Sequence, residues 1–279
     1  MKILIIGKGY LGTRCAETWK DEAILSDKVV ESVEDVEKLI DEHQPDAVLN
    51  AAGVVGKPNV DWCETHQAET IEGNTILPIT IARACANKNI YLLHMGTGCI
   101  FYGPKPDGTP WDEDDFANPS AVYTRAKYAA DLVLSTMDNI GIARIRMPLD
   151  SRPHRANFID KISSFAKVIS VDNSLTVVED MIDVFYQLLE KRASGIFHVT
   201  NPGSVNHKEI LTWYEQYVDP SHSNEWIEEG DLLKLGLTNK KRSNNIMTSK
   251  NLPKLGIHMR PAKEAVEDAV KKYAEFKKQ

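Results

Sequence analysis

The chain has 279 residues, of which 42% are hydrophobic and 26% charged, as in a globular protein whose core needs no disulfide or metal. Its net charge of −7 argues against a nucleic-acid or anionic-membrane partner, because both need a basic face. No apolar run approaches the ~20 residues of a membrane span, no signal peptide is recognised and the four cysteines form no C-x-x-C pair, so we expect a cytoplasmic protein with reduced thiols and no metal site.

Strand-length apolar runs alternate with helical periodicity as far as residue 200. We predict strands at residues 2–6, 23–25, 47–51, 90–95, 142–147 and 196–199. Helices are predicted at residues 11–20, 33–43, 66–87 and 121–137, and Pro78 is expected to kink or restart the third of them. This α/β alternation predicts a doubly wound parallel sheet with helices on both faces, which is the Rossmann fold.

After residue 200 the alternation of strands and helices ends, and we expect short helices and loops there. We therefore predict a nucleotide-binding Rossmann domain over residues 1–147 and about 166–200. A smaller substrate-binding lobe is predicted over residues of about 148–165 and 201–279. The acidic run Asp112 to Asp115 is interpreted as a solvated loop.

The string Gly7-Lys8-Gly9-Tyr10-Leu11-Gly12 follows the first predicted strand and opens the first predicted helix. Glycines at this place let the backbone turn tightly and approach a pyrophosphate, which then rests on the helix amino terminus. The G-x-G-x-x-G pattern therefore predicts a dinucleotide cofactor bound by Gly7, Gly9, Tyr10, Leu11 and Gly12.

The choice between NAD and NADP stays open at the end of the second predicted strand. Asp27 could bond a ribose hydroxyl, which would favour NAD. Ser26, Lys28 and Arg14 could instead hold a 2′-phosphate, which would favour NADP.

Tyr123 and Lys127 are four residues apart in a predicted helix and therefore share one face. An ammonium beside a phenol favours the phenolate, so we expect the pKa of Tyr123 to be lowered from its usual value of about 10. Such a phenol can exchange a proton with a carbonyl oxygen while a hydride moves, and Lys127 can bond the nicotinamide ribose. This pair resembles the short-chain dehydrogenase arrangement, in which Thr97, after the fourth strand, is the expected third member.

Cys99 follows Thr97 by two residues, so in an extended chain both side chains face the same way. This spacing predicts a thiol in the pocket where hydride transfer occurs, which a plain reductase does not need. A 4-keto sugar has acidic protons on the carbons beside its keto group, and a thiolate could remove one of them.

Longer strings extend the pattern over nearly the whole chain. They are Asn50-Ala51-Ala52-Gly53, Pro58-Asn59-Val60-Asp61-Trp62-Cys63-Glu64, Thr97-Gly98-Cys99-Ile100-Phe101, Arg144-Ile145-Arg146-Met147-Pro148, Asn157-Phe158-Ile159-Asp160-Lys161-Ile162, Thr200-Asn201-Pro202-Gly203 and Arg242-Ser243-Asn244-Asn245. Together they resemble the UDP-4-keto-6-deoxyglucose 3,5-epimerase/4-reductases that complete UDP-L-rhamnose synthesis. These are extended short-chain dehydrogenases related to dTDP-4-dehydrorhamnose reductase and GDP-fucose synthase.

The resemblance implies roles for residues of several of these strings and for the Tyr123–Lys127 pair. Reduction with NADP(H) falls to Thr97, Tyr123 and Lys127, while Cys99 and Lys161 form an epimerisation pair that acts on opposite faces of the sugar ring. Further cofactor contacts are implied at Ala51, Ala52, Gly53 and Met147. Contacts with a nucleotide-linked sugar are implied at Gly98, Asn157, Phe158, Arg242 and Asn245, with Arg242 holding the diphosphate. The family also suggests a homodimer formed through helices that flank the sheet.

Two features depart from the family pattern and three hypotheses stay open. The glycine loop is one residue shorter than the family's G-x-x-G-x-x-G, and Lys57 stands where an arginine is expected. The chain could be a bifunctional epimerase/reductase, a 4-reductase of an already epimerised dTDP- or UDP-linked sugar, or a non-catalytic NADP-binding regulatory subunit. The choice of UDP rests on the resemblance alone.

Overall fold

The computed structural model describes residues 1–57 and 59–278, so Pro58, quoted in one of the strings above, lies outside the described residues. The chain divides into two compact units. The first comprises Met1–Ile100, Pro119–Arg144 and Ile182–Phe197. The second comprises Phe101–Asn118, Ile145–Met181 and His198–Gln279.

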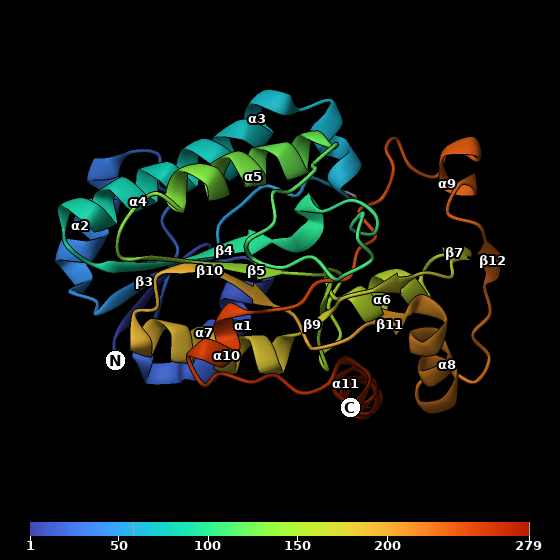
Figure 1. Ribbon diagram of the computed structural model, residues 1–279. Coiled ribbons are helices and arrows are strands. Elements are labelled where there is room, and N and C mark those ends of the chain that lie inside the picture. The colour runs from blue at the N-terminus through green and yellow to red at the C-terminus, as the bar shows by residue number, and fades with distance from the viewer. Residues whose placement is uncertain (58, 279) are drawn as a thin grey trace. The chain divides into compact units, whose positions relative to one another are not determined.

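A six-stranded sheet forms the centre of the first unit (Figure 1), with strand order β10-β5-β4-β3-β1-β2. The strands are β1 (Ile3–Ile6), β2 (Ala23–Ser26), β3 (Ala47–Asn50), β4 (Tyr91–Thr97), β5 (Ile140–Ile145) and β10 (Gly195–Val199). Strand β1 pairs in parallel with β2 and β3, and β3 pairs in parallel with β4. This sheet confirms the predicted Rossmann fold.

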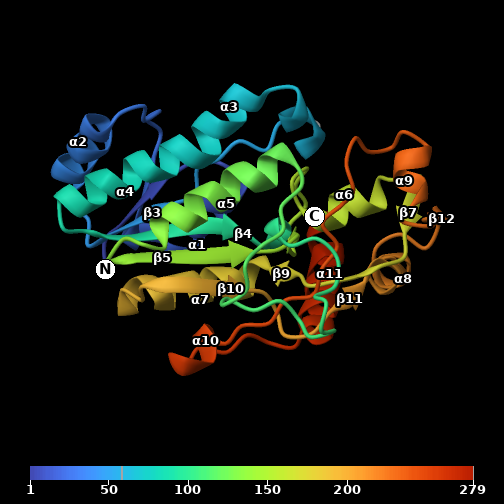
Figure 2. The ribbon, with the colours of Figure 1, turned by 45° about the horizontal axis from the view of Figure 1, so that its top comes forward.

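Helices cover both faces of the sheet, with α2, α4 and α5 on one face and α1 and α7 on the other (Figures 1 and 2). The α-helices are α1 (Tyr10–Trp19), α2 (Val33–His43), α3 (Gln67–Ile71), α4 (Leu77–Asn87), α5 (Val122–Leu134) and α7 (Val178–Lys191). Shorter turns are η1 (Lys20–Glu22), η2 (Val60–Glu64), the π-helical η3 (Glu72–Ile76) and η4 (Gly98–Ile100). Apolar side chains such as Leu4, Val36 and Ile81 fill the space between α2, α4 and the sheet.

The helix predicted at residues 66–87 is interrupted, because the π-helical turn η3 separates α3 from α4. Pro78 lies in the first turn of α4, where a missing N–H removes no helical hydrogen bond. Helix α7 has no counterpart among the predicted elements, although Met181, Phe185 and Leu188 recur at helical spacing and are buried.

The second unit pairs short strands and packs helices around its own core. Its strand pairs are β6 (Pro148–Leu149) with β9 (Thr176–Val177), β7 (Lys167–Ile169) with β12 (Glu225–Ile227), and β8 (Asp172–Asn173) with β11 (Val205–Asn206). Its helices are α6 (Phe158–Ser163), α8 (His207–Tyr217), α9 (Asp231–Lys234), α10 (Asn251–Lys254) and α11 (Ala262–Lys277). With 16 residues α11 is not short, so that part of the prediction is wrong. Its buried face, which includes Val266 and Val270, packs in one core with Ile210 of α8.

Residues 101–118 and 166–181 belong to the second unit, a division that differs from the predicted domain boundaries. Phe101 stacks on Trp111 with 4.8 Å between ring centroids. The backbone nitrogen of Trp111 donates to the carbonyl oxygen of Ile246 at 2.9 Å. Ile246 lies far along the chain from Trp111, and sequence periodicity does not report such contacts. Among the described residues, no helix combines the length and the apolar character needed to cross a bilayer.

Candidate functional site

The glycine loop joins β1 to α1 in the first unit. Gly7 has a φ of 114°, and a Cβ built on it would lie 2.4 Å from the nitrogen of Ala52. A Cβ on Gly12 would lie 2.2 Å from the carbonyl oxygen of Gly7. Gly9, by contrast, has open space at its Cβ position. The outer glycines therefore allow the chain to close on itself, and the middle glycine leaves the helix terminus accessible.

The amino terminus of α1 fits the phosphates of a dinucleotide. Gly9 is the N-cap and offers no side chain, and no acidic residue occupies the first turn, where Tyr10 and Leu11 are half-buried. The first N–H groups of a helix lack intrahelical partners and carry partial positive charge, so they can donate to a pyrophosphate.

The residues predicted to select the cofactor lie on α1 and at the end of β2. Ser26 is buried, and its hydroxyl oxygen accepts a hydrogen bond from the nitrogen of Lys28 at 3.2 Å. Arg14 is also buried, with Nη1 3.7 Å from Oε2 of Glu17. Asp27 and Lys28 are exposed, so they are the accessible charged groups at this strand end.

The segment after β3 is fixed by Asn50, which is fully buried. Its Oδ1 accepts a hydrogen bond from the nitrogen of Ala52 at 3.0 Å, and its Nδ2 lies 3.1 Å from Nδ1 of His94. Since a Cβ on Gly7 would also meet Ala52, the structure brings Ala51 and Ala52 against the glycine loop.

Gly53 continues this segment towards the predicted catalytic lysine. A Cβ built on Gly53 would lie 3.0 Å from Oδ1 of Asn74 and 3.9 Å from Nζ of Lys127. Asn74 in turn accepts from the nitrogen of Val54 at 3.1 Å and donates to its carbonyl oxygen at 2.7 Å. The predicted cofactor contacts of the first unit are therefore contiguous from the glycine loop to Lys127.

Strand β4 extends to Thr97, and the chain then turns into η4. The assumption of an extended chain up to Cys99 is therefore wrong. The backbone nitrogen of Cys99 donates instead to Oγ1 of Thr97 at 3.2 Å. Gly98 is buried, whereas Cys99 is partly exposed, unlike the buried Cys15, Cys63 and Cys85. Of these thiols, that of Cys99 is therefore the one that a ligand can reach.

Tyr123 lies in the first turn of α5, is partly exposed, and forms a hydrogen bond with Thr97. Burial raises the pKa of Tyr123, the ionised form of Cys99 raises it further, and the bond to Thr97 opposes both. The prediction of a lowered pKa is therefore wrong, because removing the phenolate from water outweighs its favourable contacts. At neutral pH Tyr123 keeps its proton, which is the form that can donate to a carbonyl oxygen.

Lys127 is buried one helical turn further along α5. Its Nζ donates to the carbonyl oxygen of Met95 at 3.0 Å. Burial lowers the pKa of Lys127 to about 8, and the charge of Asp131 opposes this shift. Asp131 is itself paired with Arg144, whose Nε lies 2.8 Å from Oδ2.

In the second unit, Asn157 has a structural role as the N-cap of α6. It is fully buried and caps α6, with Oδ1 accepting from the nitrogens of Asp150 at 3.0 Å and Ile159 at 3.1 Å. Its Nδ2 donates to the carbonyl oxygens of Asp150 at 2.7 Å and Arg152 at 2.9 Å. With both ends of the amide bound to backbone, Asn157 is not available as the substrate contact that the resemblance implied.

The neighbouring predicted residues are more accessible. Phe158 is half-buried in the first turn of α6, with its ring centroid 5.4 Å from that of His207, and Lys161 is exposed on the same helix. Met147 is half-buried and has a φ of 41°, a left-handed conformation that is unusual for a residue with a side chain. Strained residues of this kind cluster at functional sites.

Arg242 and Asn245 differ in exposure, since Arg242 is half-buried and Asn245 is buried. Nδ2 of Asn245 donates to the carbonyl oxygen of Phe101 at 2.8 Å, and its backbone nitrogen donates to Oδ1 of Asn173 at 3.0 Å. Asn245 thus anchors the segment that carries Arg242.

The acidic run 112–115 is not a solvated loop, because Asp112 and Glu113 are buried. Glu113 accepts hydrogen bonds from the nitrogen of His198 at 2.9 Å and the nitrogen of Lys250 at 2.8 Å. Nζ of Lys250 lies 2.8 Å from Asp112. These partners are more than eighty residues away in the chain, as the separations of 85 and 137 residues show, so the run itself gives no sign of them.

Residues 1–275 match the RmlD substrate-binding domain family. The chain belongs to this family. Its fold superposes with a TM-score of 0.90 on the crystal structure of the L780 UDP-rhamnose synthase from Acanthamoeba polyphaga mimivirus, at 29% identity and over 98% of this chain and 99% of that one. It also superposes with a TM-score of 0.81 on a dTDP-4-dehydrorhamnose reductase of Bacillus anthracis in complex with NADP, at 20% identity over 96% and 97% of the two chains, which is a likeness of fold.

A longer plant protein is also similar. The chain is 34% identical over 266 residues to a trifunctional UDP-glucose 4,6-dehydratase/UDP-4-keto-6-deoxy-D-glucose 3,5-epimerase/UDP-4-keto-L-rhamnose-reductase of Arabidopsis thaliana. The match covers 91% of this chain but spans only 39% of the plant protein. Together with the RmlD family match, these findings confirm the family resemblance drawn from the sequence strings.

Sequence reasoning missed several polar residues that shape the site of this RmlD-family chain. His94, Asn74, Asp131 and Arg144 are all buried beside the predicted site residues. The available signals were a polar residue in an apolar strand at His94 and an acidic residue four places after Lys127 at Asp131. Neither signal indicates a role in the site unless the residue is known to be buried, which only the fold shows.

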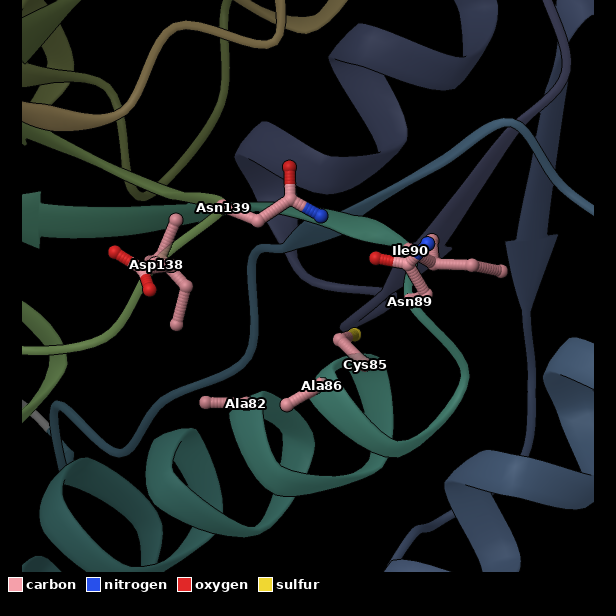
Figure 3. A pocket seen from close by; sticks show the side chains of 8 residues that line it. Ala82, Cys85, Ala86, Asn89, Ile90, Asp138 and Asn139 are labelled. Atoms are coloured by element: carbon pink, nitrogen blue, oxygen red, sulfur yellow. The ribbon is translucent and has the colours of Figure 1, made fainter.

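A small hollow of about 150 Å³ lies apart from this site (Figure 3). Its lining includes Cys85 of α4, Asn89 just before β4, and Asp138 and Asn139 just before β5. It therefore opens at the amino-terminal ends of β4 and β5, whereas the candidate site follows their carboxyl ends.

Proposed function

We propose that the chain is an NADPH-dependent reductase of a nucleotide-linked 4-keto-6-deoxy sugar, and that it also epimerises this sugar at carbons 3 and 5 before reduction. The supporting observation is the hydrogen bond between Tyr123 and Thr97, with the thiol of Cys99 on the adjoining turn and Lys127 one helical turn away. A UDP-linked substrate and UDP-L-rhamnose as product follow the similarity to the L780 UDP-rhamnose synthase.

Reduction needs a hydride at carbon 4 and a proton at the carbon-4 oxygen. A nicotinamide cofactor supplies the hydride when it is bound. Thr97 and Tyr123 orient the keto oxygen by hydrogen bonds, and the neutral phenol of Tyr123 donates the proton as the new C–H bond forms. Lys127 would hold the ribose of the cofactor, and the backbone N–H groups after Gly9 and the residues Ala51 to Gly53 would hold its remaining parts.

Epimerisation needs a base and an acid on opposite faces of the ring. In the proposal, the thiolate of Cys99 removes a proton from a carbon beside the keto group, and the resulting enolate regains a proton on its other face from the ammonium of Lys161. The C–H bond broken and the C–H bond formed balance, so no oxidant is needed. Arg242 is proposed to hold the diphosphate, Gly98 and Phe158 are proposed to contact the sugar, and Met147 is proposed to contact the cofactor.

NADPH is proposed over NADH because the similar Bacillus anthracis reductase was crystallised with NADP and because the cationic side chain of Lys28 is exposed after β2. Asp27 at the same place favours NAD, so the two cofactors need direct comparison.

The deciding experiment incubates the protein with UDP- or dTDP-4-keto-6-deoxyglucose and either NADPH or NADH, and identifies the sugar by NMR. The proposal expects a rhamnose product from the UDP sugar with NADPH. Two outcomes would contradict the epimerase part of the proposal and support a 4-reductase alone. One is a 6-deoxy sugar that keeps the gluco configuration at carbons 3 and 5, and the other is turnover only with pre-epimerised sugar. If neither cofactor is oxidised with any of these sugars, both enzyme hypotheses are rejected and the regulatory-subunit hypothesis is retained.

We also propose that the protein is a homodimer. Ile71 of α3, Ile76 of η3 and Leu132 and Val133 of α5 are exposed apolar side chains on neighbouring elements of the first unit, with 46%, 44%, 47% and 42% of their surfaces accessible. Exposed apolar side chains of this kind suit an interface with a second copy of the chain. Light scattering of the protein and of Leu132→Arg tests this, since the variant should be monomeric if the patch is the interface.

A further inference from the structure

Three charged side chains are buried together in the first unit. Lys127, Asp131 and Arg144 are only 5%, 1% and 2% exposed. Tyr123, Lys127 and Asp131 follow one another at four-residue spacing and therefore share one face of α5. Burying charges is costly unless they are paired, so a group of three in the core beside a reactive phenol requires an explanation.

Consecutive residues of strand β4 contact or approach these groups of α5 and β5. The carbonyl oxygen of Met95 accepts from Nζ of Lys127 at 3.0 Å, and Thr97 bonds Tyr123. Between them, a Cβ on Gly96 would lie 3.4 Å from Oδ1 of Asp131 and 3.3 Å from Cγ of Arg144. Gly96 therefore leaves room for the carboxylate beside the strand that carries the catalytic contacts.

The two oxygens of Asp131 have different surroundings. Oδ2 accepts from Nε of Arg144 at 2.8 Å. Oδ1 is buried and has no hydrogen-bond partner among the residues that the structure describes. A salt bridge that only tied α5 to β5 would be expected to use both oxygens, because arginine can donate to a carboxylate in a bidentate way. The negative charge on Oδ1 is therefore not neutralised by a hydrogen bond and can stabilise a positive charge nearby in the core.

We propose that Asp131 is a positioning residue that keeps Lys127 in its ammonium form inside the protein, and that Arg144 keeps Asp131 ionised for this task. The step towards catalysis rests on the proposed function, in which the charged Lys127 binds the cofactor ribose beside Tyr123. In this proposal Arg144 of β5 acts on Asp131, and Asp131 acts on Lys127.

The groups that face Lys127 support this assignment. They are Asp131 from α5 and His94 from β4. Tyr123 precedes Lys127 by one helical turn on α5, and Arg144 of β5 is paired with Asp131. Burial, and then the charge of Lys127, lower the pKa of His94 well below its usual value, so His94 is neutral. Tyr123 is neutral for the reasons given above. Burial raises the pKa of Asp131, and the charge and hydrogen bond of Arg144 oppose that shift. In the proposal, Asp131 held ionised by Arg144 is the anion that opposes the effect of burial on the pKa of Lys127.

The test measures the charge of Lys127 directly in the protein without cofactor or sugar. In protein labelled with [13C]lysine, the Cε resonance of Lys127 is assigned by its loss in Lys127→Met and followed with pH. The wild-type midpoint is expected near pH 8. Removing a facing opposite charge in Asp131→Asn should lower it by about 1 to 3 pH units. Arg144→Gln should lower it as well, and the double variant should go no lower than Asp131→Asn alone.

Asp138→Asn is the matched control. It removes the same charge from an exposed residue just before β5, outside the candidate site (Figure 3), and should leave the midpoint unchanged. Melting curves are recorded for every variant. A midpoint in Asp131→Asn within about 0.3 pH units of wild type, with or without lost stability, would overturn the proposal and leave Asp131 a packing residue.

A measurement on unaltered protein covers the case in which Asp131→Asn does not fold. In protein labelled with [13C]aspartate, the Cγ resonance of Asp131 should show an inflection at the pH where Lys127 loses its proton, and Lys127→Met should abolish it. Absence of that inflection in wild type would also overturn the proposal. Because neither titration uses cofactor or sugar, its result is independent of whether the proposed function is right.

Discussion

The backbone nitrogen of Cys99 donates a hydrogen bond to Oγ1 of Thr97 at 3.2 Å, so the thiol and the hydroxyl that bonds Tyr123 are held on one turn. Strand β4 ends at Thr97, and the turn η4 rather than an extended chain sets the direction of Cys99. Two chemistries, protonation of an oxygen and removal of a proton from carbon, are thereby proposed for neighbouring residues that mutation can separate.

Cys99→Ala should abolish the exchange of solvent deuterium into the 4-keto sugar while leaving reduction of pre-epimerised sugar within about threefold of wild type, because the phenol that protonates the oxygen is unchanged. Deuterium incorporation is read by NMR or mass spectrometry. Cys85→Ala, at a buried thiol beside the hollow at the amino-terminal ends of β4 and β5, is the control and should exchange normally. Exchange at the wild-type rate in Cys99→Ala would contradict the epimerase assignment.

Tyr123→Phe should lower kcat for reduction by about 10² to 10⁴-fold, the usual contribution of a positioned proton donor. NADPH affinity, measured by fluorescence, should change little, since the ring and the helix remain. Deuterium exchange catalysed by Cys99 should persist. A loss in kcat of less than tenfold would show that another group supplies the proton.

The affinity for NADPH should fall as pH rises through about 8, where Lys127 loses its proton. The contribution of Lys127 to the free energy of unfolding changes with pH in the opposite direction. Its pKa is depressed in the folded state, so between pH of about 8 and about 10.4 the unfolded chain binds more protons and stability rises with pH. Fluorescence titrations from pH 6 to 10 check the binding part, and Lys127→Met should lose the inflection. An affinity that is constant across pH 8 in wild type would contradict the assignment.

Gly12→Ala and Gly9→Ala should separate folding from phosphate binding. The added methyl of Gly12→Ala meets the carbonyl oxygen of Gly7 at 2.2 Å, so both melting temperature and NADPH affinity should drop. The methyl of Gly9→Ala meets nothing within 4 Å, so the loss of stability should stay near the ~1 kcal/mol of an altered N-cap. It should still weaken NADPH binding by obstructing the phosphates. Unchanged affinity in Gly9→Ala would place the cofactor elsewhere.

Asn157→Ala should destabilise the protein by about 2 to 4 kcal/mol, because a helix cap is lost and buried backbone groups of Asp150 and Arg152 lose their partner. Asn59→Ala removes an exposed cap on η2 and should cost less than about 1 kcal/mol. Chemical denaturation measures both. A raised KM for the sugar without lost stability in Asn157→Ala would instead support the substrate contact first expected from the sequence.

The sequence predicted well wherever the relevant physics is local. The strand–glycine–helix order at Ile6, Gly7 and Tyr10 needs only a four-residue apolar run and a turn, and the structure has it at that place. The four-residue spacing of Tyr123 and Lys127 needs only a helix, and α5 provides it. Prediction was less successful where partners come from far along the chain. Glu113 was interpreted as solvated because nothing near it shows that His198 and Lys250 bind it.

By itself the sequence determined the Rossmann fold, the glycine loop, the positions of the Tyr123–Lys127 pair and the family, because periodicity and short motifs encode them directly. Only the tertiary structure decided that Tyr123 keeps its proton, that Asn157 is a buried cap and that Asp131 and Arg144 form a buried ion pair. Those properties depend on burial, and a side chain's pKa and free hydrogen-bonding groups follow from which distant residues exclude water from it.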